Sequence, residues 1–182
     1  MRAAIILLIL GVGVGCAVYK PVRVIAPQMF GLTCFEGDIC VADVTKEAEA
    51  RALYDEALVF VESNIGDIEA LPPGLFCSTV VCFSKFADPQ VAAVNVGTFG
   101  ILMNAHGWQP HIVRHELIHH WQNEQFGRRA VALSLPRWYI EGMAYTLSED
   151  PRDPLPRDDI QAWRQDFRDW VAAGNDWRQP PE

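Results

Sequence analysis

Two histidines four residues apart, with a glutamate beside the first, are the residues of this chain whose types and spacing favour chemistry. They are His115, Glu116 and His119, in the order HELIH. On an α-helix the two histidines lie about 40° apart in azimuth and ~6 Å apart along the axis, so both imidazoles face the same way and can bind one metal ion. Glu116 lies about 100° from His115 around the helix, so it flanks that ion and can accept a proton from a water molecule without being a ligand.

The surroundings of this motif supply a helix and a third ligand. Pro110 is typical of the first position of a helix and Gly127 of a C-terminal cap, which predicts a helix of about 17 residues around the motif. A second predicted helix carries the sequence WYIEGMA, in which Glu141 follows His119 after 21 intervening residues. That separation leaves room for a turn and an antiparallel return. Three protein ligands with one open position are typical of a catalytic zinc site.

The pattern HExxH, followed about twenty residues later by W-x-x-E-G-x-A, resembles the gluzincin zinc metallopeptidases, the thermolysin type also described as peptidase MA-like. The resemblance implies a single compact zincin-like domain. It also implies that His115, His119 and Glu141 bind one zinc ion per chain and that Glu116 is the general base and acid. The implied substrate is a peptide or protein.

Other patterns of zinc peptidases fit less well. The metzincin pattern requires Gly and His where this chain has Gln122 and Gln125. One position also departs from the thermolysin pattern, in which an Asp four residues after the ligand glutamate often orients a zinc histidine. This chain has Tyr145 there, so the groups that orient the metal ligands are expected to differ.

Several further side chains are candidates for the site. Stabilising a developing oxyanion needs a donor besides the metal, and the choice among the eligible residues stays open. They are Tyr139, Tyr145, His106 and Arg137. His111 is expected to be a solvated residue of the first helical turn, although it could line the same face as His115. His120 points away from His119 and is expected to be a surface or packing residue.

Hydrophobic patterns predict an α+β fold, with a small mixed sheet followed by the active-site helix and the glutamate helix. Apolar residues recurring at i, i+3, i+4 and i+7 indicate an amphipathic helix over residues 46–63. Runs of β-branched or apolar residues indicate strands over residues 79–86, 91–96 and 99–103, and the last is expected to be an edge strand that can hold an extended peptide. The other predicted elements are a short strand over 22–26, a loop over 34–40, a helix over 134–147 and a last helix from 160 to 174.

The N-terminus reads as a targeting segment. Residues 3–19 form an apolar run preceded by Arg2, which predicts a signal peptide or membrane anchor over residues 1–20. The sequence ending in Cys16 is similar to a bacterial lipoprotein signal, which would make Cys16 a lipidation site. An uncleaved anchor and a cleaved signal are the alternatives. The domain itself is expected over 21–174, with a flexible tail over 175–182.

The other four cysteines fall into two local pairs. Cys34 with Cys40 and Cys77 with Cys82 suit two disulfides formed in an oxidising compartment, although three connectivities are formally open. Four buried free thiols are the alternative. The pairs and the N-terminal segment together predict an extracytoplasmic, membrane-attached protein, either periplasmic or at the cell surface.

The charge of the chain argues against nucleic acid as a partner. The 182 residues include 15 Lys and Arg against 23 Asp and Glu, a formal net charge of −8. Such an acidic chain repels phosphate backbones. The functional prediction is therefore zinc-dependent peptide hydrolysis. The alternative is a non-catalytic, exported binding or assembly module on the same fold.

Overall fold

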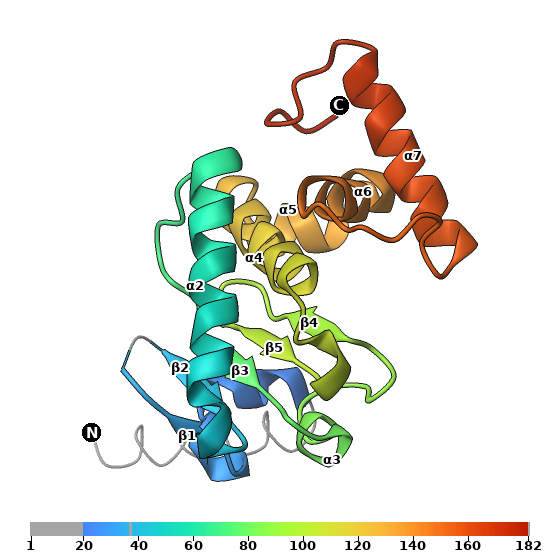
Figure 1. Cartoon of the computed structure of the whole chain (residues 1–182). Helices are drawn as coiled ribbons and strands as arrows, with labels where there is room; N and C mark the ends of the chain where they lie inside the picture. Colours follow the sequence, from blue (N-terminus) through green and yellow to red (C-terminus); the bar gives the residue numbers. More distant parts are fainter. Residues whose placement is uncertain (1–19, 37, 182) are drawn as a thin grey trace.

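A computed structural model describes residues 20–36 and 38–181, so the apolar run over 3–19 and Cys16 lie outside the described residues. Within the described part the chain forms a mixed α+β structure, in which one small sheet is followed by a series of helices (Figure 1). This confirms the predicted α+β class with a small mixed sheet. None of the helices in the described part is both long and apolar enough to cross a membrane.

The sheet has the strand order β1-β2-β3-β5-β4. Its three central strands, β2 (Ile39–Val41), β3 (Gly74–Phe76) and β5 (Ile101–Met103), run parallel and are fully buried. Burial on both faces explains why these strands are apolar at every position and show no alternation of polar residues. The edge strands β1 (Thr33–Cys34) and β4 (Ala93–Asn95) are antiparallel to their neighbours.

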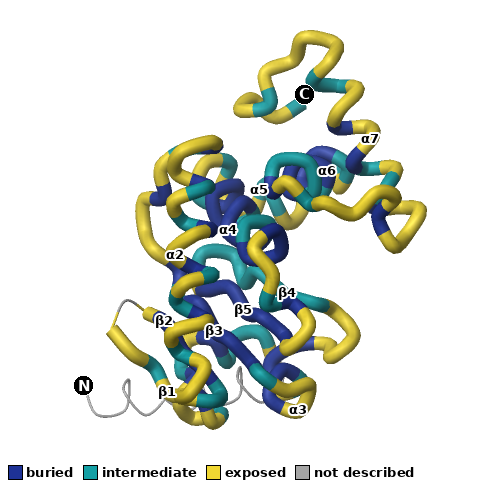
Figure 2. Tube along the Cα trace, in the orientation of Figure 1, coloured by how far each residue is buried: buried dark blue, intermediate teal, exposed yellow. Residues whose placement is uncertain are grey.

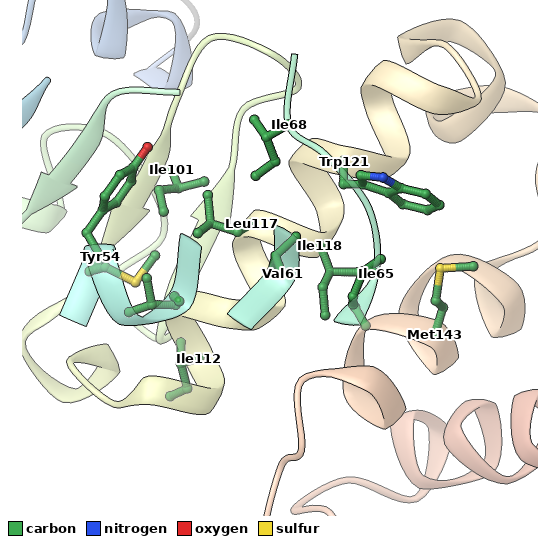
Figure 3. Packing of buried hydrophobic residues seen from close by; sticks show 14 of the residues in the cluster. Tyr54, Val61, Ile65, Ile68, Ile101, Ile112, Leu117, Ile118, Trp121 and Met143 are labelled. Carbon is green, nitrogen blue, oxygen red and sulfur yellow. The ribbon is translucent and has the colours of Figure 1, made fainter. Parts of the chain in front are cut away.

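Two long helices cover one face of the sheet. They are α2 (Glu47–Asn64) and α4 (Pro110–Gln125), which pack against each other as well as against the strands (Figure 1). Figure 3 shows the resulting core, in which Val61 of α2 lies among Leu117 and Ile118 of α4. Buried residues concentrate in the central strands and in α4 (Figure 2). Helix α4, which carries the HELIH motif, is therefore held by the main core.

The opposite face of the sheet has a second, smaller core. Because successive side chains of a strand point to opposite faces, Cys40, Leu75 and Leu102 face this side while their strand neighbours face α2 and α4. Three short helical segments supply the cover: η1 (Lys20–Ile25), η2 (Pro27–Phe30) and α3 (Val80–Phe83). Two further 3₁₀ turns, η3 (Val44–Lys46) and η4 (Ala105–Gly107), precede α2 and α4.

The C-terminal third is helical. It comprises α5 (Arg128–Leu133), α6 (Arg137–Leu147) and α7 (Asp158–Ala172), with α6 packed between α4 and α7. Gly142 allows the close approach of the last two helices, because a Cβ at that position would lie 2.2 Å from the carbonyl oxygen of Trp163. After α7 the chain returns, and Trp177 packs against Trp121 of α4.

Five sequence predictions agree with these elements: the helix over 46–63, the active-site helix, the glutamate helix, the last helix, and a strand within 91–96. Two predicted strands are wrong. Residues 22–25 fall in η1, where Val24 alone is buried, and the backbone turns so that the amide of Ala26, just after η1, donates to the Arg23 carbonyl. Residues 79–86 contain α3, because Thr79 caps a helical turn by accepting a hydrogen bond from the Cys82 amide.

The sheet also contains pairings that the sequence did not reveal. The predicted loop over 34–40 is a hairpin of β1 and β2, and β3 was not predicted at all. The strand within 99–103 exists as β5, but it lies inside the sheet, and its neighbour β4 is the edge strand on that side. Both predicted disulfides are present, Cys34–Cys40 between opposed residues of the hairpin and Cys77–Cys82 across the start of α3.

Candidate metal centre

Helix α4 presents the two histidines as the spacing predicts. Pro110 occupies its first turn, and the motif lies in its middle. The Nε2 atoms of His115 and His119 are 3.0 Å apart. Both imidazoles therefore point at one place on the helix surface, which is half-buried between α4 and α6.

Helix α6 brings Glu141 to the same place. Its Oε2 atom lies 3.6 Å from Nε2 of His115 and 3.4 Å from Nε2 of His119. A tetrahedral zinc ion with bonds of ~2.0–2.1 Å separates its ligand atoms by about 3.3 Å, so the three donor atoms already stand at the spacing that one such ion requires. The three residues thus form a group that can hold a metal ion.

The charges of the group are strongly coupled. Burial lowers the pKa of His119, but the carboxylate of Glu141 outweighs burial and raises that pKa to about 9. Burial raises the pKa of Glu141, but the charge of His119 and hydrogen bonds from both histidines hold it well below its usual range. A proton on His119 therefore balances Glu141, and a bound cation can take that role instead.

Glu116 lies beside this group but outside it. Its side chain is 6% exposed, and within the described residues its Oε2 atom has no hydrogen-bond partner. Burial raises the pKa of its carboxyl, against the nearby charges of His115 and His119. A buried carboxylate oxygen without a partner is costly unless a water, ligand or substrate group satisfies it. This placement suits a proton acceptor next to a metal ion.

Gln122 orients His119, a role that the sequence analysis did not assign. The Nδ1–H of His119 donates to Oε1 of Gln122 at 2.8 Å, so Nε2 is the ring nitrogen that faces the other two donor atoms and can bind a metal in place of its proton. The Gln122 amide in turn donates to the backbone carbonyl of Ile140 at 3.0 Å, one residue before Glu141. Its position three residues after His119, on the same helix face, is the signal that could have identified it.

The donor atoms open into a cleft of about 1330 Å³. One wall is the edge strand β4, whose flanking residues Ala92 and Val96 form hydrogen bonds with Asn104 and Gly100 on either side of β5. In an antiparallel pair these bonds alternate, so the backbone groups of Ala93 and Asn95 point away from β5 toward the free edge. The Asn95 side chain also reaches the Glu116 carbonyl at 3.5 Å, which ties this edge to α4.

The structure places three of the four candidate oxyanion donors in the cleft and the fourth outside it. His106, Arg137 and Tyr145 line the cleft, and the Tyr145 ring lies 4.5 Å from that of His115. Arg137 is engaged with Glu141, at 3.3 Å. Tyr139 is fully buried on the opposite side of α6, where its hydroxyl donates to the Trp177 carbonyl. Tyr139 is therefore part of the core and lies outside the cleft.

The two remaining histidines of α4 are both buried. The prediction that His111 is solvated is wrong, because the chain after α6 covers it and places Asp150 3.8 Å from its Nε2 atom. Burial lowers the pKa of His111, although Asp150 opposes the shift. His120 is fully buried and its Nε2 atom lies 2.8 Å from the Ala70 carbonyl, which agrees with a packing role.

The chain matches no protein-family model, and no curated protein or solved structure matches it significantly.

Proposed function

We propose that the protein is a gluzincin-like metallopeptidase that hydrolyses peptide bonds with a zinc ion held by His115, His119 and Glu141. One observation carries the proposal: three donor atoms lie within 3.0–3.6 Å of one another, beside the buried and unpartnered carboxylate oxygen of Glu116. Two imidazoles and one carboxylate are a ligand set typical of catalytic zinc. A purely structural zinc site would need a fourth protein ligand and no adjacent base.

When bound, zinc supplies Lewis-acid polarisation of a substrate carbonyl and makes water more acidic. Glu116 accepts a proton from the attacking water and passes it to the leaving amine, which is the role of a general base that becomes a general acid. Gln122 holds His119 with its Nε2 atom toward the ion. Tyr145 and His106 line the cleft and are available to donate a hydrogen bond to the developing oxyanion.

The edge strand β4 supports a peptide as the substrate. An extended peptide added beside Ala93 and Asn95 can pair with their free backbone groups, as a further strand of the sheet. The link from Asn95 to the Glu116 carbonyl keeps that strand next to the metal ligands. Backbone pairing of this kind recognises an extended chain regardless of its side chains.

The compartment is the second part of the proposal. Two disulfides are typical of proteins that fold in an oxidising space outside the cytoplasm. We infer that the chain acts there, attached to a membrane through its N-terminal segment, which remains a prediction from the sequence.

The decisive test compares three forms of the chain: wild type, Glu116→Gln and His119→Ala. We expect wild type and Glu116→Gln to bind about one zinc ion per chain and His119→Ala to lose it. Wild type should cleave members of a mixed peptide library, detected by mass spectrometry, and Glu116→Gln should cleave them roughly 10²–10⁴-fold more slowly. Cleavage that persists unchanged in Glu116→Gln would contradict the mechanism. A library left intact by zinc-loaded wild type would favour the binding module instead.

A further inference from the structure

The charge of the cleft is opposite to that of the chain. Five arginines and three carboxylates line it, although the chain as a whole has 15 basic and 23 acidic residues. Two of the three carboxylates belong to the metal centre, Glu116 and Glu141. A positively charged cleft in an acidic protein attracts anionic ligands and raises their local concentration.

Three of these arginines already face a carboxylate. Arg137 pairs with Glu141 at 3.3 Å, and the other two pair with acidic residues close to them in sequence. Those two pairs are Arg152 with Asp150 and Arg157 with Asp159. Since each of these charges is balanced locally, they contribute less to the attraction of an anionic ligand than an unpaired arginine would.

Arg128 and Arg129 differ from the other three. Within the described part of the chain, no carboxylate lies within ion-pair distance of either guanidinium. The Arg128 guanidinium lies over the Phe99 ring, 4.3 Å from its centre. Stacking uses the face of the guanidinium and leaves its edge N–H groups for a planar acceptor such as a carboxylate.

Arg128 is fixed at the end of the edge strand. A Cβ built on Gly97 would lie 3.1 Å from its Nε atom, so the side chain lies against the backbone just beyond β4. Asn95, two residues earlier, contacts the metal-bearing helix. At ~3.3 Å per residue, a peptide extended along β4 reaches Arg128 about two or three residues from the bond beside the metal.

We propose that Arg128 and Arg129 bind a carboxylate of the substrate, two or three residues from the bond that is cleaved. The carboxylate belongs either to an acidic side chain or to the C-terminus of the peptide. This inference rests on the proposed function for the identity of the substrate, and it makes the enzyme selective for acidic peptides or for bonds near a carboxyl terminus.

The test measures binding, so that it does not depend on cleavage. The probes are fluorescently labelled octapeptides that differ only by Glu or Gln at one position, each with a free or an amidated C-terminus. They are titrated into the zinc-loaded full-length Glu116→Gln chain, alone or combined with Arg128→Gln, Arg129→Gln or both. The matched control is Arg168→Gln, which removes the same charge from an exposed position of α7 outside the cleft.

We expect a peptide with a correctly placed carboxylate to bind roughly 3- to 10-fold more tightly than its neutral match, with a loss of that preference at high salt. The double arginine variant should lose the preference, and its affinity for the neutral peptide should stay within about twofold of that of the Glu116→Gln parent. Arg168→Gln should change neither the preference nor this affinity. If the preference depends on the position of Glu, the bound carboxylate is that of a side chain. If the preference disappears when the C-terminus is amidated, the bound carboxylate is that of the C-terminus.

Three outcomes would overturn the inference: equal binding of charged and neutral peptides, a preference that the double variant retains, or the absence of any peptide binding. The proposed function is judged separately, by cleavage of the neutral octapeptides with wild type. Acid-selective binding without any cleavage would support the arginine site and contradict the hydrolase, whereas unselective cleavage would do the reverse.

Discussion

At the scale of single residues, the candidate metal centre depends on side chains outside the group of three donor residues. His119 binds an ion through Nε2, and the hydrogen bond from Nδ1–H to Gln122 turns Nε2 toward the place that Glu141 faces, where an ion takes the place of the Nε2 proton. Gln122 is itself immobilised by its bond to the Ile140 carbonyl. A glutamine therefore orients His119. The chain has Tyr145 at the position where the thermolysin pattern often has an orienting aspartate.

This argument predicts the effect of removing the Gln122 amide. Gln122→Met keeps the size of the side chain and loses the acceptor for His119, so zinc affinity should fall about 10- to 100-fold. The measurement is competition with a chromophoric chelator, with circular dichroism to confirm folding. Gln125→Met, at an exposed position of the same helix, is the matched control and should bind zinc as wild type does. Equal zinc affinity in Gln122→Met would show that Gln122 only fills space.

At the scale of elements, the position of Glu141 depends on how α6 is clamped. Helix α4 contacts α6 on one side and α7 lies against the other. Gly142, next to the ligand, is buried under the α7 backbone, where Trp163 and Phe167 leave no room for a Cβ. Contact at this distance requires glycine, which explains why the ligand glutamate is followed by one.

Gly142→Ala should separate α6 from α7. A Cβ would lie 2.2 Å from the Trp163 carbonyl oxygen and 2.7 Å from Cβ of Phe167, so the backbone of one helix must move. We expect the free energy of unfolding to fall by about 1–3 kcal/mol, as for overpacking elsewhere, and zinc affinity to fall with it. Urea titration measures the free energy of unfolding, and competition with a chromophoric chelator measures zinc affinity.

Ala162→Val provides the comparison for that experiment, because it adds bulk on the exposed face of α7, away from α6. It should cost no more than about 0.7 kcal/mol, the scale of helix propensity. A Gly142→Ala chain as stable as wild type would contradict a helix contact that requires glycine.

At the scale of the whole molecule, an ion held by His115, His119 and Glu141 would join two parts of the fold. His115 and His119 belong to a helix packed on the sheet, whereas Glu141 belongs to the C-terminal helices. An ion that binds the folded chain and not the unfolded chain stabilises the fold, by about 2.7 kcal/mol at a free concentration of 100 times its dissociation constant. Zinc should therefore raise the melting temperature of the whole domain.

The size of this stabilisation should depend on pH. Without metal, the His119 pKa of about 9 exceeds the value of 6.5 for a free histidine, so the charged form stabilises the fold below pH 6.5 and this contribution disappears as pH rises through about 9. Zinc must displace that proton, so its affinity should rise up to about tenfold per pH unit between pH 6.5 and 9. Thermal melts at pH 6.5, 7.25 and 8.0, with free zinc buffered by a chelator, should show a growing shift. A shift independent of pH would contradict a protonated His119 in the metal-free chain.

The sequence by itself determined the parts of this protein that depend on local geometry. The His115–His119 pair follows from the pitch of one helix, and that helix follows from Pro110 at its start and Gly127 after its end. The two disulfides follow from short loops that bring neighbouring cysteines together. In each case a few consecutive residues contain all the atoms that interact, so the pattern predicts the contact.

The tertiary structure alone decided the contacts that form between elements. Strands of two or three residues are too short to show a period, so β1, β2 and β3 became visible only as paired partners in a sheet, and the sheet order made β4 the edge. Three further features depend on which helices pack against each other. They are the burial of His111, the position of Tyr139 in the core, and the hydrogen bond from Gln122 to the Ile140 carbonyl. Such contacts join residues far apart in the chain, and packing selects among alternatives that the local sequence leaves equal in energy.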